Sequence, residues 1–600
     1  MFKLVKDIIS ILNKEQRREY YYLQFFVVLT AIAEILSLAS IGPFMALVGN
    51  IDLVDQNGII NSIYLYFELN NPMQFLFITG LLVLLLLFLS AIISIYTITK
   101  LSFFAARTGA EIGDSLYDYY LNKDYLFHTQ TSSSYLIKQI ATEVSRVTDN
   151  VLQPYVQINA RIIATLFIST AVFLYNPLVA VSGLTLFFIS YYILFFAVKG
   201  RLLRNGLNIS DVSKKRFLLM NEGFGSIKDV KILNRQEYFI SQFKRSGEVF
   251  SEAYGSSNSL YNMPRYIMEF IVYSGMVSLV LVLISNSNGD LSEVLPVLAV
   301  FGMAAFKLLP SFQQIYSGAA QIKSNISAFE SIKKDILSSR INENNKNYVE
   351  EYISGEGDIF VNNVSFTYPN ESSAALNEIN LTIPKNSVIG IVGSSGSGKS
   401  TLLDILLGLI KPTSGDVYCS GRKIENKNLK SWQKKIGYVP QNIFIKDGNI
   451  TENIAFGLLL EQVDEKKLSN AIELSQLQEW VDTLPNGLMT ELGEKGIQMS
   501  GGQRQRIGIA RALYENAEYL FFDEATSALD GRTENLIMNA IDNISGSKTI
   551  IMIAHRINTV MNCDVIYMIE SGRVVDKGTY SYLIENNEHF KKMATGIIDE

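Results

Sequence analysis

The sequence predicts two parts: an all-α part with six membrane-spanning helices over residues 1–340, and a soluble α/β part over residues 357–600. Long apolar stretches dominate the first part. The second part alternates short apolar strands with helical segments around a glycine-rich loop. Residues 341–356 between them are polar and rich in Asn and Glu, which is typical of a linker. Six hundred residues also exceed what one core organises, so at least two domains are expected.

Composition excludes several classes of protein. The formal net charge of −6 gives no basic footprint for a nucleic acid. With two cysteines, Cys419 and Cys563, and three histidines, neither a disulfide framework nor a Cys- or His-built metal site is expected. Residues 1–22 carry scattered charges and no small-residue cleavage site, so no removable signal peptide is expected. The apolar residues between Phe2 and Leu12 predict either an interfacial helix or a packed elbow.

Six stretches are apolar and long enough to cross a bilayer, which takes about 20 residues. Residues 59–67, between the first two, repeat apolar side chains at helical spacing. They predict either an external helix lying on the membrane or one packed against the bundle. The predicted spans are Tyr21–Leu47, Gln74–Thr97, Ile158–Tyr175, Leu178–Val198, Tyr266–Ile284 and Leu291–Leu309.

The charges of the segments that connect the predicted spans provide a separate test of the number of spans. Residues 51–73 and 286–290 contain no Lys or Arg, whereas Lys100–Arg146 and Lys199–Arg245 contain several. Basic connections are retained in the cytoplasm, so the alternation predicts six spans with both termini cytoplasmic. The two basic connections are long enough to extend their helices beyond the bilayer, with turns expected within Gly113–Lys123 and Glu222–Leu233.

Charged residues also occur inside the predicted spans. At about 1.5 Å per residue, Glu34, Arg161, Glu269 and Lys307 all fall roughly 20–25 Å below the outer surface. Charge facing lipid is costly, so these residues predict a polar layer that faces a cavity. Two interpretations remain open. In the first, the four charges pair with one another for packing or lie where the helices have already emerged into the cytosol. In the second, Arg161, Lys307 or the nearby Arg265 contacts an anionic headgroup of a substrate.

The glycine-rich loop, Gly393–Thr401, predicts a phosphate site. Glycines let successive backbone N–H groups converge on an anion without a Cβ in the way. We expect Lys399 to reach the β- and γ-phosphates and Ser400 to ligate Mg²⁺. The soluble part is therefore expected to bind a nucleoside triphosphate. The predicted nucleotide-binding residues of the loop are Gly393, Ser394, Ser395, Gly396, Ser397, Gly398, Lys399, Ser400 and Thr401.

A second acidic site follows the apolar run Tyr519–Phe522. A buried strand would deliver Asp523 to its end, where Mg²⁺ is expected. The adjacent Glu524 can polarise a water for in-line attack on the γ-phosphate. Upstream, Phe366 and Tyr368 end a predicted strand and offer an aromatic face to a base.

The run Met499-Ser-Gly-Gly-Gln503 closely resembles the signature of ATP-binding cassette (ABC) transporters. The resemblance covers essentially the whole soluble part, and Glu491–Glu494 resembles the exporter X-loop before the signature. Two positions depart from the family pattern, Met499 in place of leucine and Asn449 in place of Thr or Ser. The resemblance implies that Tyr368 stacks on adenine and that Gln441 is the Q-loop glutamine and a Mg²⁺ ligand. It also implies that Asp530 is the D-loop aspartate and His555 the switch histidine. The catalytic residues implied are Glu524, His555, Lys399 and Gln441.

The resemblance implies a dimer. In the family, the signature residues Ser500, Gly501, Gly502 and Gln503 clamp ATP held by the opposite subunit. Ser500 and Gly502 open a predicted helix, whose N-terminal N–H groups and dipole favour an anion. One six-span unit with one cassette is a half-transporter, most simply a homodimer with two composite ATP sites. The implied activity is ATP-driven alternating access in a bacterial inner membrane, with the cassette cytoplasmic.

The expected substrate rests on membrane segments that resemble bacterial flippases for lipid-linked oligosaccharides. These are Glu34 with Pro43-Phe44, Pro264-Arg265 with Glu269, and Lys307–Ser311. Lys307 replaces the family's arginine, which keeps the charge but loses bidentate phosphate recognition.

Other functions remain as alternatives. A lipid or multidrug exporter of the same architecture is the main rival, and a peptide exporter is disfavoured because no peptidase domain precedes the first span. An ATP-gated channel or regulatory module would be expected to lose hydrolytic residues such as Glu524. A DNA-repair or chromosome-organising ATPase would carry coiled-coil heptads in place of the spans.

Overall fold

The computed structural model describes residues 2–49, 51–54, 64, 71–175, 177–286, 291–344, 351–353, 357–369, 371–493, 499–524, 538, 541, 544–554 and 556–595. Contacts divide the chain into two compact units. The first comprises Met1–Lys123 and His128–Lys346, and the second comprises Asp124–Phe127 and Asn347–Glu600.

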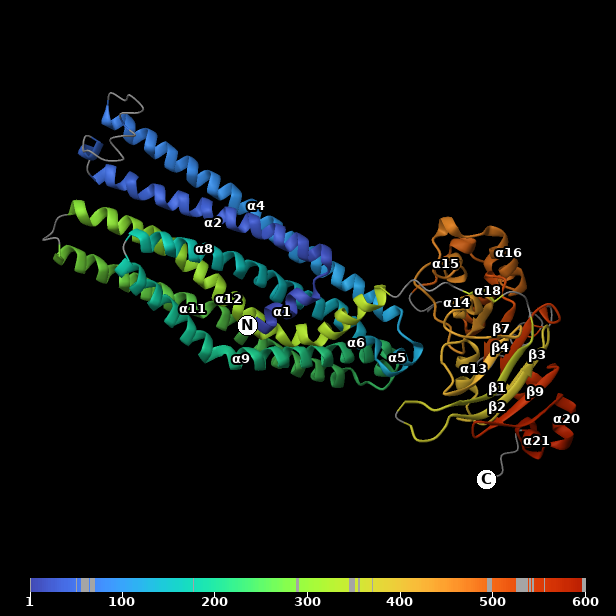
Figure 1. Cartoon of the computed structure of the whole chain (residues 1–600). Helices are drawn as coiled ribbons and strands as arrows, with labels where there is room; N and C mark the ends of the chain where they lie inside the picture. Colours follow the sequence, from blue (N-terminus) through green and yellow to red (C-terminus); the bar gives the residue numbers. More distant parts are fainter. Residues whose placement is uncertain are drawn as a thin grey trace. The chain divides into compact units, whose positions relative to one another are not determined.

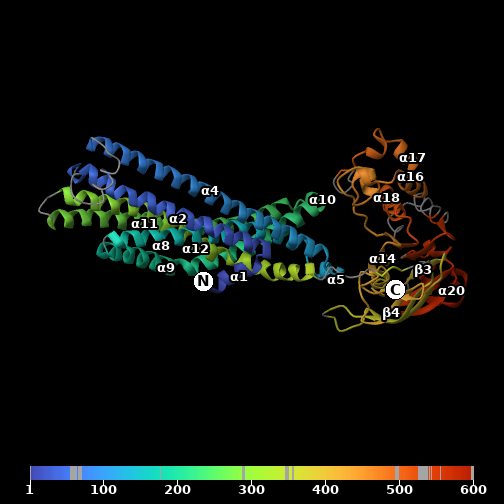
Figure 2. The ribbon, with the colours of Figure 1, turned by 45° about the horizontal axis from the view of Figure 1, so that its top comes forward.

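The first unit is all-helical in its described residues, and its long helices lie side by side along most of their length (Figures 1 and 2). The predicted spans lie within these long helices. The long helices are α2 (Lys14–Gly49), α4 (Pro72–Leu121), α8 (Gln153–Tyr175), α9 (Pro177–Gly225), α11 (Gln236–Asn286) and α12 (Leu291–Asn344). The short elements are α1 (Phe2–Ile11), the 3₁₀ turn η1 (Ile51–Val54), α6 (Ser133–Lys138), α7 (Val144–Val147), α10 (Ile227–Ile232) and two π-helical turns, η2 (Gln139–Glu143) and η3 (Thr148–Leu152). Helix α5 (Tyr125–Gln130) is divided between the units, because Asp124–Phe127 belong to the second.

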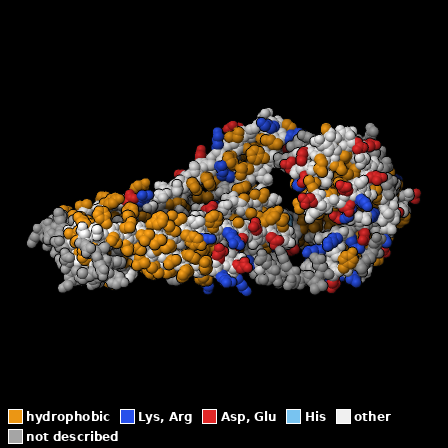
Figure 3. Space-filling view, turned by 90° about the horizontal axis from the view of Figure 1, so that it is seen from above, with side chains coloured by type: hydrophobic (Ala, Val, Ile, Leu, Met, Phe, Trp, Pro, Cys, Tyr) orange, Lys and Arg blue, Asp and Glu red, His pale blue; other side chains and the backbone are white. Residues whose placement is uncertain are grey.

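Four helical stretches in the described part of the chain are long and apolar enough to cross a membrane: Lys14–Gly49, Pro72–Leu121, Ser133–Leu174 and Gly183–Gly225. They contain the first two predicted spans and overlap most of the third and fourth. Figure 3 shows the surface that results: hydrophobic side chains gather over a long stretch of the helical unit, and charged side chains gather beyond it. The fifth and sixth predicted spans fall within α11 and α12 and stay predictions. The chain is an integral membrane protein.

The ends of the long helices depart in part from expectation. Helix α4 continues to Leu121, so the first of the two predicted turns comes only at the end of the range Gly113–Lys123. The second turn falls as expected, with α10 between α9 and α11. The predicted external helix at 59–67 lies outside the described residues except for Tyr64, whose ring packs edge-on against Phe75 with centroids 5.5 Å apart.

Helix α1 packs as an elbow. Ile8, Ile11 and Leu12 are almost fully buried, and Asp7 forms a 2.9 Å ion pair with Lys333 of α12. These contacts favour the packed elbow over an interfacial helix. In contrast, the apolar side chains of α4 that face outward remain exposed, as expected for a lipid-facing surface.

The second unit contains a six-stranded sheet of order β10-β9-β3-β8-β7-β6 and a four-stranded sheet of order β2-β1-β4-β5. The strands are β1 (Ile359–Phe366), β2 (Leu376–Ile383), β3 (Val388–Val392), β4 (Ser414–Cys419), β5 (Arg422–Lys423), β6 (Ile436–Val439), β7 (Tyr519–Asp523), β8 (Thr549–Ile553), β9 (Val565–Glu570) and β10 (Arg573–Gly578). The helices are α13 (Lys399–Leu406), α14 (Leu429–Gln433), α15 (Ile450–Ile454), α16 (Glu465–Leu474), α17 (Gln478–Asp482), α18 (Gly501–Tyr514), α20 (Tyr580–Asn586) and α21 (Glu588–Thr595), with 3₁₀ turns η4 (Leu460–Gln462), η5 (Gly487–Met489) and η7 (Ile557–Val560).

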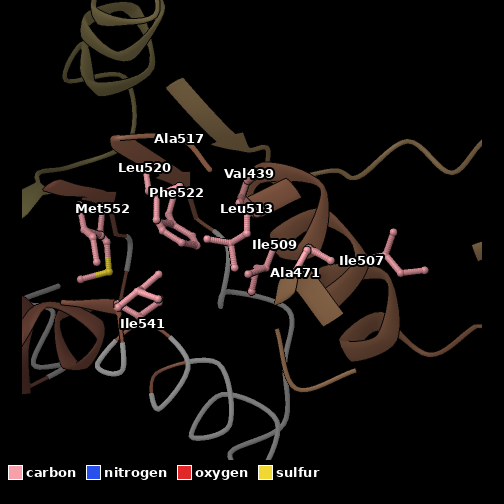
Figure 4. Close-up of a cluster of buried hydrophobic side chains, with 14 of the residues drawn as sticks. Val439, Ala471, Ile507, Ile509, Leu513, Ala517, Leu520, Phe522, Ile541 and Met552 are labelled. Atoms are coloured by element: carbon pink, nitrogen blue, oxygen red, sulfur yellow. The ribbon is translucent and has the colours of Figure 1, made fainter. Parts of the chain in front are cut away.

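Strand β7 is buried on both faces, and its side chains divide between two cores because successive residues point to opposite sides. Leu520 and Phe522 join the cluster in Figure 4, together with Ile509 and Leu513 of α18. Phe521 joins the cluster on the other face, which includes the four-stranded sheet and α13. A parallel strand that is covered on both faces is expected to have a continuous apolar sequence, and Tyr519–Phe522 is such a sequence.

Strands β3, β6, β7 and β8 are parallel neighbours. Their carboxyl ends therefore share one edge of the sheet, where a parallel α/β sheet places its ligands. The glycine-rich loop follows β3, and Asp523 closes β7. The register of the strands thus brings the two predicted phosphate-handling segments to the same edge.

Candidate nucleotide site

The glycine-rich loop leads from β3 directly into α13, with Gly398 as the N-cap. Gly398 has φ of 103° and Gly396 has φ of 78°, in the left-handed region that glycine tolerates best. A Cβ on Gly398 would lie 2.6 Å from the Ala375 carbonyl oxygen. The glycine therefore serves both the turn and the close approach of the neighbouring backbone. The N-terminal N–H groups of α13 point toward the loop, as an anion site requires.

Lys399 is buried inside this loop. Its Nζ donates to the carbonyl oxygens of Gly393 and Ser394, at 2.9 and 2.8 Å. Burial lowers the pKa of the Lys399 ammonium, while the nearby Glu524 and Asp523 partly offset this. Among the described residues, the buried Ser397 Oγ has no hydrogen-bond partner. An unsatisfied buried hydroxyl, a buried cation and a helix N-terminus together fit a phosphate group.

Asp523 and Glu524 lie where β7 ends. Asp523 is paired with Ile553 of β8, and the Glu524 N–H donates to the Ile553 carbonyl at 3.0 Å. Glu524 has φ of 49°, an unusual conformation for a residue other than glycine, which functional sites often retain. Gln441 follows β6, and its Nε2 donates to Glu524 Oε2 at 2.5 Å. The structure thus brings the predicted Q-loop glutamine to the predicted catalytic carboxylate.

Sequence reasoning missed two residues beside Asp523. Asp404 lies four residues after Ser400 and therefore on the same face of α13. Burial, together with the charge of Asp523, raises the pKa of Asp404 to about 6. Tyr438 on β6 is hydrogen-bonded to Asp523, and burial raises the pKa of its phenol. The spacing from Ser400 was a signal for Asp404, whereas Tyr438 required the pairing of β6 with β7.

The predicted base-stacking aromatic is half-buried. The Tyr368 hydroxyl lies 3.1 Å from Thr401 Oγ1, which links the ring to the start of α13. Phe366 packs edge-on against Tyr368, with centroids 4.9 Å apart and planes at 83°. This contact is favourable for two aromatic rings and holds Tyr368 beside the glycine-rich loop.

The signature run begins α18. Ser500 is the N-cap: its Oγ accepts from the Gln503 N–H at 3.2 Å, and Gln503 Oε1 accepts from the Ser500 N–H at 2.8 Å. This reciprocal capping box leaves the N–H groups of Gly501, which is exposed, and of Gly502, which is buried, at the helix N-terminus. The signature residues are therefore arranged as expected for a second anion clamp.

Both departures from the family pattern have a structural explanation. Met499 is 6% exposed and packs in the core cluster beside α18, where an unbranched thioether can replace leucine. Asn449 is the N-cap of α15, and its Oδ1 accepts from the Glu452 N–H at 2.9 Å. Asparagine is among the best N-cap residues, so this function of Thr or Ser is preserved.

Three predicted features lie outside the described residues. These are the D-loop aspartate Asp530, the switch histidine His555, and Glu494 at the end of the predicted X-loop. The preceding Glu491 is described and forms a β-bridge with Asn449. Strand β8 ends at Ile553, two positions before His555, at the same sheet edge as β3 and β7.

The structure separates the five predicted substrate residues of the membrane unit. Glu34 of α2 lies 4.0 Å from Arg161 of α8, and both line a pocket. Arg265 and Glu269 pair with each other on α11, with Nε 2.7 Å from Oε1. Lys307 is half-buried on α12. Pairing thus accounts for four of these side chains.

A family model described as "ABC transporter" matches residues 376–527, which include the glycine-rich loop, the signature and Asp523. The chain carries an ABC transporter ATP-binding domain. Because that domain is fused to apolar helices, the predicted half-transporter architecture is confirmed.

The fold agrees with an ABC exporter along almost its whole length. A structure titled "a bacterial Atm1-family ABC exporter with ATP bound" superposes with a TM-score of 0.78, covering 97% of this chain and 100% of that one at 19% identity. The predicted fold class is therefore confirmed: helical membrane unit plus ABC ATPase unit.

Several curated ABC proteins are similar in sequence. The ATP-dependent lipid A-core flippase of Photobacterium profundum is 32% identical over 326 residues, so the match spans 54% of this chain and 54% of that protein. The heterocyst differentiation ATP-binding protein HepA of Nostoc is 28% identical over 463 residues, 76% of this chain and 74% of HepA. A Lactococcus lactis multidrug resistance ABC transporter is 37% identical over 229 residues, 38% of each chain.

Proposed function

We propose that this chain is an ATP-driven exporter that moves an amphipathic substrate from the cytoplasmic to the outer leaflet. The observation that carries the proposal is the hydrogen bond between Gln441 and Glu524, formed beside Asp523 and at the same sheet edge as the Lys399 loop. A carboxylate positioned beside the phosphate loop is what in-line hydrolysis of a γ-phosphate needs. The ATP-binding domain supplies the energy and the fused helices supply the path.

Each residue then has a defined task. Lys399 exchanges its loop carbonyls for β- and γ-phosphate oxygens, and the N–H groups of the loop bind the remaining phosphate charge. Glu524 accepts a proton from the attacking water, and Gln441 orients the Glu524 carboxylate through Nε2. His555 would donate to the γ-phosphate, and Tyr368 would stack on adenine.

Ser400, Gln441 and Asp523 would hold Mg²⁺. They suit this ion because hydroxyl, amide and carboxylate oxygens are its preferred ligands. When bound, Mg²⁺ neutralises charge that develops on the β- and γ-phosphates. Tyr438 positions Asp523 by its hydrogen bond to that carboxylate.

We also propose a homodimer with two composite sites. The N-terminus of α18, with Ser500, Gly501, Gly502 and Gln503, closes on ATP bound to the partner's loop, and Asp530 joins the two halves. ATP then links the cassettes, and hydrolysis releases them, so the membrane helices alternate between two conformations. The two connections that are rich in Lys and Arg support a bacterial inner-membrane protein whose termini and ATP-binding domain are cytoplasmic. The proposed division is a membrane domain over residues 1–340, a linker over 341–356 and an ATP-binding domain over 357–600.

The proposed substrate is a lipid-linked oligosaccharide or a related glycolipid. The name of the P. profundum relative, a lipid A-core flippase, supports a glycolipid. On this chain Arg265, Glu269 and Lys307 would contact the polar part of that substrate. A multidrug exporter is the second candidate, supported by the L. lactis relative.

Replacing Glu524 tests the hydrolytic half of the proposal. Glu524→Gln keeps the shape of the side chain and its contact with Gln441 but removes the base, so turnover should fall at least about 100-fold. Binding of ATP with Mg²⁺ should persist and accumulate as a trapped nucleotide. ATPase activity and retained nucleotide are measured on the full chain in nanodiscs; hydrolysis at the wild-type rate would refute the role.

Transport itself needs a second measurement. Vesicles carrying the protein should move an undecaprenyl-diphosphate glycolipid to the far leaflet with ATP, but not after Glu524→Gln. A panel that includes simple phospholipids and drug-like cations decides between the two candidate functions.

A further inference from the structure

Helix α18 lies close against the stretch of chain that leads to Gln441. A Cβ added to Gly437 of β6 would lie 2.5 Å from the Ala512 carbonyl oxygen of α18, so a side chain at this position would clash. Val439 of β6 and Leu513 of α18 belong to the same core cluster, the one drawn in Figure 4. The chain is therefore fixed against α18 just before it reaches Gln441.

The contacts with α18 resume just after Gln441. Gly508 of α18 faces Ile443, because a Cβ added to this glycine would lie 2.3 Å from Ile443 Cδ1. One residue further along the chain, the Phe444 carbonyl oxygen accepts a hydrogen bond from Nη2 of Arg511, at 3.0 Å. Gln441 thus lies in a stretch of chain that α18 holds on both sides.

Arg511 makes the polar part of this junction. Its Nε donates to the Asn453 carbonyl oxygen at 2.8 Å, and its guanidinium carbon lies 4.6 Å from the centre of the Phe456 ring. Asn453 is fully buried, and its side chain bonds both the N–H and the carbonyl of Lys446, at 2.8 and 3.0 Å. A guanidinium suits this junction, because its N–H groups form a fixed planar fork. Arg511 and Asn453 together hold Phe444 and Lys446.

The backbone around Gln441 depends on these contacts. Residues 440–446 belong to neither a helix nor a strand, so ladder hydrogen bonds do not fix them. Gln441 is nevertheless the residue whose Nε2 bonds Glu524 Oε2. A catalytic group has to be held within about 0.5 Å of its productive position by the residues that support it. The contacts with α18 supply that support from the far side of Gln441.

We propose that Arg511 is a positioning residue for ATP hydrolysis. It holds residues 441–446, the Gln441 segment, against α18, and Gln441 in turn orients the Glu524 carboxylate. The inference rests on the proposed function, since it takes Glu524 as the base. It adds a residue outside both the glycine-rich loop and the signature run, one that acts through Gln441 and not on ATP itself. Because α18 begins beside Ser500, the same contacts connect the signature to Gln441.

The test replaces Arg511 in the full chain, reconstituted in nanodiscs. Arg511→Gln keeps a polar side chain but removes the guanidinium fork. The matched control is Arg506→Gln on the same helix, because Arg506 Nη1 also donates to a backbone carbonyl, that of Gln476, at 2.9 Å. Each variant loses a comparable contact of α18, so their melting temperatures should fall by similar amounts. Arg511→Gln alone releases the Gln441 segment.

Amide hydrogen exchange without nucleotide measures the positioning directly. Exchange of the Gln441 segment should be at least about tenfold faster in Arg511→Gln than in the wild type, because local opening follows the loss of local contacts. It should be unchanged in Arg506→Gln. This measurement requires neither ATP nor a partner subunit, and it reports a change that a general loss of stability would not confine to one segment.

Steady-state hydrolysis measures the consequence for catalysis. In Arg511→Gln, kcat should fall at least about tenfold while KM for ATP changes less than about twofold, because a misplaced base affects the chemical step and not nucleotide binding. Arg506→Gln should keep the wild-type kcat. Arg511→Lys retains a cation that reaches one carbonyl at a time, so its kcat and its exchange should lie between those of the wild type and Arg511→Gln.

Two results would overturn the proposal. One is equal exchange of the Gln441 segment in the wild type and in folded Arg511→Gln, and the other is an equal loss of kcat in Arg511→Gln and Arg506→Gln. If Arg511→Gln does not fold, Arg511→Lys carries the same comparison. Failure of the proposed function has a different signature, hydrolysis by Glu524→Gln at the wild-type rate. The exchange measurement would then still decide whether Arg511 holds the Gln441 segment.

Discussion

Glu524 illustrates how single residues define the nucleotide site. Its φ of 49° and its backbone bond to Ile553 direct the carboxylate toward Gln441 rather than along the strand. The Asp-Glu pair after an apolar strand predicted this role from sequence, because the motif is contiguous. Asp404 was missed, because its significance depends on Asp523, which is remote in sequence and adjacent only in the folded sheet.

Asp404 should make the stability of the nucleotide-free protein depend on pH. Its pKa is raised to about 6 in the folded state, against about 4 in an unfolded chain. Between these values the folded state binds more protons, so the free energy of unfolding falls as pH rises through this window and stays lower above it. The substitution Asp404→Asn removes this decrease in the free energy of unfolding at high pH.

We therefore expect the melting temperature of Asp404→Asn to exceed that of the wild type at pH 8 and to match it near pH 4. Thermal unfolding in the absence of ATP and Mg²⁺ measures the difference. A constant difference at both pH values would mean that the substitution acts through packing and not through ionisation of Asp404.

At the scale of elements, the helical unit depends on close approach as well as on apolar pattern. Hydropathy predicted the positions of the long helices, because a span is a continuous local signal. It did not predict which helices pack closely. On α9, a Cβ added to Gly206 would lie 1.7 Å from the Ser324 carbonyl oxygen of α12, and Ser327 Oγ donates to the Gly206 carbonyl at 3.1 Å.

Gly206→Ala should therefore destabilise the helical unit, by about 1–3 kcal/mol or more, because α9 and α12 must separate. The matched control is Gly200→Ala on the same helix, where a Cβ meets nothing within 4 Å. That change should be neutral or stabilise by about 0.5–1 kcal/mol. Melting temperatures of both variants in one detergent decide the matter, and equal values would contradict the close contact.

At the scale of the whole molecule, each cassette has the parts of an ATP site at two separate places, the loop after β3 and the N-terminus of α18. The proposed homodimer joins the loop of one subunit to the signature of the other. The activity of mixed subunits therefore tests the assembly directly, without any measurement of the transported substrate.

Two inactive chains should complement each other. Lys399→Ala removes phosphate binding at the loop, and Ser500→Arg blocks the signature; each homodimer should be inactive. In a mixed dimer one composite site loses both parts and the other retains both, so co-expression should restore part of the wild-type ATPase activity. ATPase rates of affinity-selected mixed dimers measure this. Full inactivity of the mixture, with dimers present, would argue against sites shared between subunits.

By itself the sequence determined the local chemistry: the phosphate loop, the acidic strand end, the signature helix and the apolar spans. Each of these is written in adjacent residues, since glycine placement, strand burial and helix capping act over a few positions. The tertiary structure decided which distant groups meet. It paired Glu34 with Arg161 around a pocket and placed Asp404 and Tyr438 against Asp523. The pairing of Glu34 with Arg161 and the contacts of Asp523 depend on how helices and strands pack, which no short run of sequence encodes.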